Sequence, residues 1–433
     1  MSLSTVRRRL RQKFRSIALP DDLDEITCID TAGEVHPENA GLYVEEVEAI
    51  WSAAQAVYRT GAHPLLSICL RRGGDIVLNR TIGYQRGDAA DPNAVVADLT
   101  TPICLFSSSK GISAMLLHLL SEQGKIHLLD PVSYYIPEFA AHGKGFITIY
   151  QLLSHRAGVP GLGEDIDPDV LYDHERALEM ICAAEPIEGH GHTAAYHAIT
   201  GGFLLDELIR RTTGMNARQY MDRYFRKPLG MRYFRYGVTR RDLPRVAEHR
   251  NTGLPPGKYV GGLLRDVLGI DYESAVDLSN SDAFKTAALP SANIYCTAEE
   301  AGRFFQMMLD YGTYQGNQVM APLTVHRATQ EVGKAQLDGS LKLPMRYSAG
   351  FMLGGSPFGI YGPETHYAFG HLGLSNVSCW ADPERDISVA ILNTGKPVVG
   401  THILPTMKLQ NRIADACRPV RNMKEEGLAF LQE

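Results

Sequence analysis

The chain has 433 residues, of which 44% are hydrophobic and 21% charged, an ordinary globular composition for one large domain or two moderate ones. Its formal net charge of −6 and its pI near 6.2 argue against a nucleic-acid partner. No apolar run of roughly 18 residues occurs, so no stable membrane span is expected.

The N-terminal residues are strongly basic. Six Lys or Arg and no acid occur within the first 15 residues, and apolar side chains at helical spacing predict a short basic amphipathic helix there. No apolar core of a secretory signal follows. We interpret residues 1–40 as a basic arm that is either solvated or in contact with another subunit. In the second case the protein would be a homo-oligomer. A membrane-surface or targeting role is the alternative.

Periodicity along the rest of the chain predicts strands near both ends and helices between them. Helical spacing of apolar residues occurs at 43–60, 174–184, 201–214, 297–312 and 401–418. Two apolar runs around a Gly-Gly turn predict a hairpin at 64–87, and a second hairpin is predicted at 376–393.

The order of these elements favours an α+β fold. Strands from both termini would form one antiparallel sheet flanked by helices, with a helical domain inserted in the middle. We therefore expect a sheet domain built from residues 41–139 and 286–420, and a mainly helical domain at 140–285.

The seven cysteines are scattered, odd in number and without a C-x-x-C pair. Neither a zinc ribbon nor a disulfide framework is therefore indicated, and a reducing, cytoplasmic compartment is expected. Glycine patterns typical of nucleotide cofactors are missing, as is the G-x-S-x-G elbow of α/β-hydrolases. We expect no cofactor.

The stretch 105–120, LFSSSKGISAMLLHLL, predicts a helix that starts with three serines and a lysine. Only residues three or four apart share a helix face, so Ser107 can meet the Lys110 amine while Ser108 and Ser109 point elsewhere. A serine hydroxyl becomes a nucleophile when a base takes its proton, and a desolvated lysine can be that base. By itself Ser-x-x-Lys is a weak signal, and an N-capping serine beside a surface lysine is the alternative.

Longer stretches resemble the serine β-lactamase and penicillin-binding-protein superfamily. They include LFSSSKGISAMLLHLLSEQGKIHLLDPVSYYIPEF, ITIYQLLSHRAGVPG and YAFGHLGLSNVSCWADPERDISVAILN, in the family's order. The likeness covers about residues 43–400 and is greatest to the class C β-lactamase branch, which includes the family VIII carboxylesterases. It implies a β-lactamase-like fold.

The resemblance also implies roles for individual residues. Ser107 would be the acyl-forming nucleophile, Lys110 its base, and Tyr196 the proton relay to the leaving group. His371 to Gly373 would replace the third family motif at the edge of the site. The backbone N–H groups of Ser107 and Leu374 would form the oxyanion hole.

Two departures from the family pattern narrow the chemistry. The second motif of the lactamases is Tyr-x-Asn, but Ala198 stands at the asparagine position. The third motif begins with lysine, but here His371 replaces it, and an imidazole is a weaker anchor for the β-lactam carboxylate. Both changes remove recognition of an amide and a carboxylate while they keep the acyl-transfer residues.

Three histidines surround Tyr196 in EGHGHTAAYHA. His190, His192 and His197 have a spacing found in metal sites, but no cysteine or H-E-x-x-H motif accompanies them. We interpret them as pocket-lining or surface-loop residues and expect no metal. His155, in LSHRAGVPG, is interpreted as a hydrogen-bonded loop residue.

The sequence thus predicts a serine carboxylesterase that acts on a small-molecule ester through an acyl-enzyme intermediate. A peptidase, amidase, β-lactamase or acyltransferase with the same Ser-Lys-Tyr residues is the alternative. A non-catalytic scaffold on this fold is a further alternative, against which the presence of all three residues argues.

Overall fold

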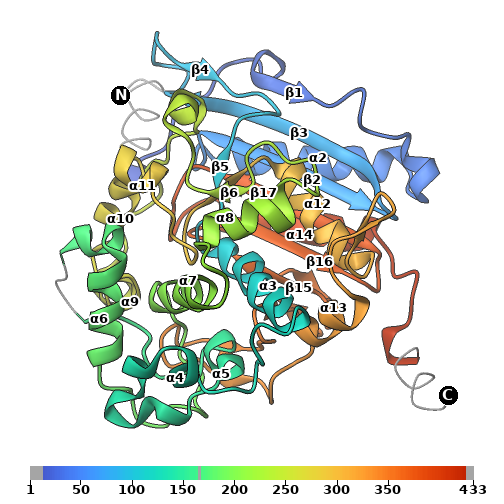
Figure 1. The fold of residues 1–433 in the computed structure, drawn as a ribbon. Helices are drawn as coiled ribbons and strands as arrows, with labels where there is room; N and C mark the ends of the chain where they lie inside the picture. Colours follow the sequence, from blue (N-terminus) through green and yellow to red (C-terminus); the bar gives the residue numbers. More distant parts are fainter. Residues whose placement is uncertain (1–12, 164–166, 426–433) are drawn as a thin grey trace.

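The computed structural model describes residues 13–163 and 167–425 (Figure 1). Its main sheet consists of β1 (Thr27–Ile29), β2 (Leu65–Arg72), β3 (Asp75–Arg86), β4 (Val95–Val96), β12 (Met352–Leu353), β15 (Phe369–Leu372), β16 (Ser378–Asp382) and β17 (Ile387–Asn393). The spatial order is β1-β3-β2-β17-β16-β15-β12, with β4 paired to β3. All of these pairs are antiparallel.

The sheet is built from both ends of the chain, as predicted. β17 pairs with β2 along the whole length of β17, and Figure 1 shows these blue and red strands side by side. Both predicted hairpins are confirmed, β2–β3 and β16–β17. Gly73 and Gly74 form the first turn with φ of +58° and +91°, values that glycine adopts without strain.

Each face of the sheet is covered by different helices. On one face, Leu66, Ile68 and Leu70 of β2 pack with α2 (Val44–Tyr58) and α14 (Ile403–Ala416). Cys69 points to the opposite face, where it packs in the cluster of α12 (Ala298–Leu309) and α3 (Ser109–Glu122). This alternation follows from the two-residue period of a strand.

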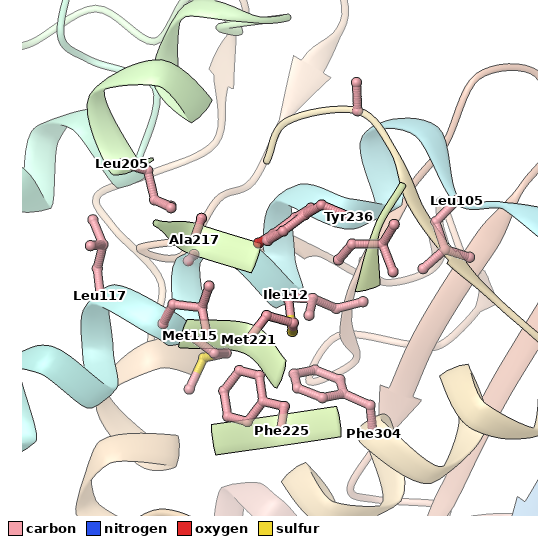
Figure 2. Packing of buried hydrophobic residues seen from close by; sticks show 14 of the residues in the cluster. Leu105, Ile112, Met115, Leu117, Leu205, Ala217, Met221, Phe225, Tyr236 and Phe304 are labelled. Atoms are coloured by element: carbon pink, nitrogen blue, oxygen red, sulfur yellow. The ribbon is translucent and has the colours of Figure 1, made fainter. Parts of the chain in front are cut away.

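Helix α3 is buried on all sides from Ser109 to Leu120. In Figure 2, Ile112 and Met115 of this helix face Phe225 and Phe304, which come from distant parts of the chain. A helix that is buried around its whole circumference lies in the interior of a large protein. The core therefore holds the start of α3, and the serines there, in a fixed place.

The middle of the chain is mainly helical. It contains α4 (Val132–Tyr135), α5 (Ile149–Leu153), α6 (His174–Ala183), α7 (Thr200–Thr213), α8 (Ala217–Met221), α9 (Lys258–Leu268), α10 (Tyr272–Leu278) and α11 (Asp282–Thr286). A small sheet of β5 (Ile103–Cys104), β7 (Ile294–Cys296) and β6 (Arg235–Tyr236) connects this part to the segment before α3.

Short elements complete the C-terminal half. They are β8 (Thr313–Tyr314), β9 (Asn317–Gln318), α13 (Pro322–Thr329), β10 (Gln336–Leu337), β11 (Pro344–Met345), β13 (Phe358–Gly359) and β14 (Gly362–Pro363). The fold is α+β, with the helical insertion in the middle of the chain. The predicted boundaries between a sheet domain and a helical domain remain a prediction.

The predicted basic helix falls on residues 1–12, which lie outside the described part of the chain. Further along the predicted arm, β1 pairs with β3 and so belongs to the main sheet. Arg15 forms an ion pair with Glu273 at 2.7 Å. Within residues 13–163 and 167–425, no helix is both long enough and apolar enough to span a bilayer.

Candidate active site

The three consecutive serines at the start of α3 have three different environments. Ser107 lies in the 3-10 turn η3 (Phe106–Ser108), and its Oγ is 3.0 Å from Lys110 Nζ. Ser108 Oγ donates to a backbone carbonyl at 2.7 Å, and Ser109 Oγ accepts from a backbone N–H at 3.0 Å. Of the three hydroxyls, only that of Ser107 is paired with an amine.

The chain before Ser107 is held in a constrained turn. Leu105 N donates to Ile294 O of β7 at 2.8 Å. Phe106 follows with φ of +47°, a left-handed conformation that costs energy for a residue with a side chain. Phe106 is buried, so the surrounding core holds this conformation in place. Such local strain is commonly found at functional sites.

Lys110 is buried, and no carboxylate of residues 13–163 or 167–425 forms an ion pair with it. Its Nζ donates to Ser291 O at 2.8 Å and lies 4.9 Å from the centre of the Tyr196 ring. Burial lowers the pKa of Lys110 well below its usual value of 10.5. A neutral amine 3.0 Å from Ser107 Oγ can accept the hydroxyl proton.

Tyr196 is buried beside this pair. Burial raises the pKa of Tyr196, and a side-chain hydrogen bond with Ser107 opposes part of the rise. The side chain is therefore a phenol at neutral pH, able to donate a proton to a leaving group. Its ring packs against His155 at 4.7 Å and faces His371 at 6.0 Å, measured between ring centres.

Asp338 positions the segment that carries Tyr196. Its Oδ1 accepts from Tyr196 N at 3.1 Å and from the backbone N–H groups of Ser340 and Leu341, each at 2.8 Å. Its Oδ2 accepts from the Tyr347 hydroxyl at 2.9 Å. Sequence reasoning missed this buried acid, because an Asp-Gly pair is typical of a turn and nothing local connects it to Tyr196.

Of the three histidines around Tyr196, only His197 lies beside Lys110. It lines a small cavity with Lys110, His155 and Ser291. Burial, and then the proximity of Lys110, lower the pKa of His197 to about 3. His155 Nδ1 accepts from His197 N at 3.1 Å, which agrees with the interpretation of His155 as a hydrogen-bonded loop residue.

His190 and His192 do not line this cavity. His190 is half-buried and His192 is exposed, both in the turn before Tyr196. Among the described residues, no group of three or more His, Cys, Asp or Glu side chains is arranged to hold a metal ion.

His371 is fully buried on β15. Its Nδ1–H donates to Leu372 O at 2.7 Å, and its Nε2 has no partner in the described part of the chain. Burial, and then Lys110, lower the pKa of His371 to about 3. The imidazole is therefore neutral, and its Nε2 carries a lone pair rather than the positive charge of a lysine.

Gly373 brings the end of β15 against the segment that precedes Ser107. A Cβ at Gly373 would be 2.3 Å from Leu105 O, which is too close for any residue with a side chain to fit there. Gly373 N donates to Val377 O at 2.8 Å, which closes a tight turn with Leu374 at its start. Within the described residues, Leu374 N has no hydrogen-bond partner and is free to bind a substrate oxygen.

The comparisons with known proteins agree with this architecture. A family model described as Beta-lactamase matches residues 51–407. The esterase/beta-lactamase LipL of Mycobacterium tuberculosis is 29% identical over 311 residues, which are 67% of this chain and 68% of LipL.

Solved structures give the same result for the fold. A penicillin-binding-protein homologue from Caulobacter crescentus superposes with a TM-score of 0.75 at 24% identity, over 87% of this chain and 99% of that one. A family VIII carboxylesterase superposes with a TM-score of 0.73 at 24% identity, over 86% of this chain and 99% of that one. The family match over most of the sequence, together with the shared α+β fold, shows that the chain belongs to the β-lactamase family of serine hydrolases.

Proposed function

We propose that this protein hydrolyses carboxylic esters through an acyl-enzyme intermediate on Ser107. The observation that carries the proposal is the buried Lys110 amine, 3.0 Å from Ser107 Oγ and next to the Tyr196 ring. Nucleophile, base and proton donor therefore lie within one small site.

Acylation follows from these positions. Ser107 Oγ attacks the ester carbonyl carbon while its proton passes to Lys110 Nζ. The N–H groups of Ser107 and Leu374 stabilise the negative oxygen of the tetrahedral intermediate. The bond from carbon to the alcohol oxygen then breaks, Tyr196 protonates the departing alkoxide, and Lys110 returns a proton to Tyr196.

Deacylation repeats these steps with water in place of Ser107. Water attacks the acyl carbon and gives its proton to the Tyr196–Lys110 pair. The bond to Ser107 Oγ breaks, Ser107 recovers a proton, and the carboxylic acid leaves. These steps balance in atoms and protons without a redox partner or a cofactor.

Two features favour esters over β-lactams. Ala198 cannot form the hydrogen bonds that asparagine offers to an amide, and His371 is neutral where a lactamase has a charged lysine. Ala198 instead lines an open pocket with the apolar side chains of Val159, Leu162 and Val267, and three carboxylate side chains also line this pocket. Val267 also packs against the cluster that contains Tyr196, so an apolar chain of the ester could occupy this pocket beside the reacting bond.

The first prediction is that Ser107→Ala abolishes both fluorophosphonate labelling and hydrolysis of short p-nitrophenyl esters. Ser121→Ala is the matched control, because Ser121 lies on the same helix and is half-buried. Wild type and this control should label and turn over alike. Labelling that survives Ser107→Ala would refute the nucleophile, and absence of labelling in wild type would favour a scaffold.

The same assay should include nitrocefin and D-alanyl peptides. We expect ester turnover to exceed both by at least about 100-fold, since an amide or lactam needs groups that Ala198 and His371 do not supply. Nitrocefin turnover equal to ester turnover would instead identify a β-lactamase.

A further inference from the structure

A second buried lysine, Lys396, lies just after β17. It is 1% exposed, and its Nζ donates to Leu374 O at 3.0 Å, Asn393 O at 3.0 Å and Asn393 Oδ1 at 3.2 Å. An ammonium has three N–H donors, so these three contacts satisfy it completely. All three acceptors are uncharged, so no ion pair accounts for the burial of this amine.

Lys396 also contacts the turn before the candidate nucleophile. Its Nζ lies 4.8 Å from the centre of the Phe106 ring, and the ring centres of Phe106 and His249 are 4.7 Å apart. Phe106 is the residue with φ of +47° that precedes Ser107. A cation over an aromatic face is attracted by the ring, most strongly where water is excluded.

These contacts join the two halves of the proposed oxyanion hole. One donor is the N–H of Ser107, in the peptide that begins at Phe106. The other is the N–H of Leu374, whose own carbonyl accepts from Lys396. The two donors belong to segments more than 260 residues apart in sequence. The Lys396 amine nevertheless contacts both segments, through the carbonyl of Leu374 and the ring of Phe106.

We propose that Lys396 is a positioning residue that holds Leu374 and Phe106 in place for oxyanion stabilisation, and that its positive charge strengthens this stabilisation. The inference rests on the proposed function of Ser107 and Leu374. Oxyanion binding favours the transition state over the bound ester, so loss of Lys396 lowers kcat and leaves KM nearly unchanged.

The charge on Lys396 titrates near neutral pH. Burial lowers the pKa of Lys396 to about 7, and the thiol of Cys104 acts in the opposite direction. Titratable groups near it also include His63 and His249, whose pKa values are lowered by burial. The Tyr272 hydroxyl donates to Lys396 O at 3.1 Å, and burial raises its pKa, so all three groups are neutral at this pH. The positive charge is therefore present below about pH 7 and lost above it.

The test compares Lys396→Met with Lys144→Met. Lys144 is a matched control, because it is equally buried, donates to two backbone carbonyls, and lies 5.5 Å from the centre of the Phe139 ring. We expect Lys396→Met to lower kcat for p-nitrophenyl esters by about 10-fold to 100-fold at constant KM. Lys144→Met should lower the melting temperature with little effect on kcat.

The pH profile separates charge from simple packing. In wild type and Lys144→Met, kcat should fall as the pH rises through about 7, and this step should disappear in Lys396→Met. Asn393→Asp provides a second variant if Lys396→Met does not fold. A carboxylate next to Nζ would raise the pKa of Lys396 and so move the step to higher pH.

The experiments distinguish an error in the role of Lys396 from an error in the proposed role of Ser107. If Ser107 is not the nucleophile, fluorophosphonate labelling either survives Ser107→Ala or is absent from wild type. If Ser107 reacts but Lys396→Met keeps its kcat within twofold of wild type, the proposal is overturned. It is equally overturned if the two Met variants lose kcat to the same extent, or if Asn393→Asp leaves the pH step in place.

Discussion

Burial, rather than ion pairing, sets the proton positions around Ser107. Lys110 has its pKa lowered and Tyr196 has its pKa raised, both chiefly by desolvation. Each shift favours the neutral form of its side chain, so an amine base and a phenol acid coexist at neutral pH. The proposed base and the proposed proton donor are thus both neutral at neutral pH.

The lowered pKa of Lys110 predicts how kcat/KM depends on pH on the acidic side of the profile. We expect kcat/KM to reach its maximum by about neutral pH, because Lys110 is already deprotonated far below 10.5. The rate should fall at lower pH as the amine takes up a proton. The measurement is ester hydrolysis against pH, corrected for the spontaneous reaction.

Lys110→Arg is the companion variant, since a guanidinium stays protonated and cannot act as a base. It should lose about 10²-fold to 10⁴-fold in kcat/KM at every pH tested. A wild-type rate that keeps climbing towards pH 10.5 would show that Lys110 retains an ordinary pKa.

At the scale of elements, α9 borders the pocket that Ala198 lines. None of its residues is fully buried, and Val267 and Leu268 at its C-terminal end line the pocket. Gly257 precedes the helix, and Tyr259 near its start is 83% exposed. The last turn of the helix therefore faces the pocket with Val267 and Leu268, beside Asp266, while Tyr259 in its first turn is in solvent.

We expect Val267→Trp to narrow this pocket and shift chain-length preference. Its kcat/KM for a p-nitrophenyl octanoate should fall at least about 10-fold relative to the acetate, since each methylene excluded from an apolar site costs about 0.8 kcal/mol. Tyr259→Trp on the same helix is the control and should keep the wild-type ratio. An unchanged ratio in Val267→Trp would place the ester chain elsewhere.

At the scale of the whole molecule, the site lies where distant segments meet. His155 follows α5, His197 precedes α7, and His371 is on β15, yet all three are buried together around Tyr196. Burial lowers the pKa of each. The fold therefore keeps three imidazoles neutral inside it.

Acid should destabilise the protein through these histidines. Below about pH 6.5 an unfolded histidine binds a proton while the buried one does not, so stability falls as pH decreases from 6.5 towards 3. For His371 the loss is about 2 kcal/mol at about pH 5. Urea unfolding at about pH 7 and pH 5 measures it.

His371→Gln should reduce this pH-dependent loss, because glutamine binds no proton in either state. His192→Gln changes an exposed histidine and should leave the loss as in wild type. Equal losses in wild type and His371→Gln would show that His371 does not contribute.

Local pattern was sufficient for the longer helices α2, α3, α6, α7, α12 and α14, for the two hairpins and for the Ser107–Lys110 contact. The pair depends on a spacing of three residues, which helix geometry converts directly into contact. Alternating apolar residues around Gly73 and Gly74 likewise predicted β2 and β3. The resemblance to a known family added Tyr196, His371 and Leu374 as candidates, which local pattern alone could not connect.

The sequence by itself therefore determined these elements and the spacing of Ser107 and Lys110, since both arise from interactions between near neighbours. Only the tertiary structure decided that Asp338 holds the Tyr196 segment, and that Lys396 joins Leu374 to Phe106. These contacts join residues far apart in the chain, and no local period encodes them. The neutral states of Lys110 and His371 also belong to the tertiary structure, because desolvation exists only once the core has closed around them.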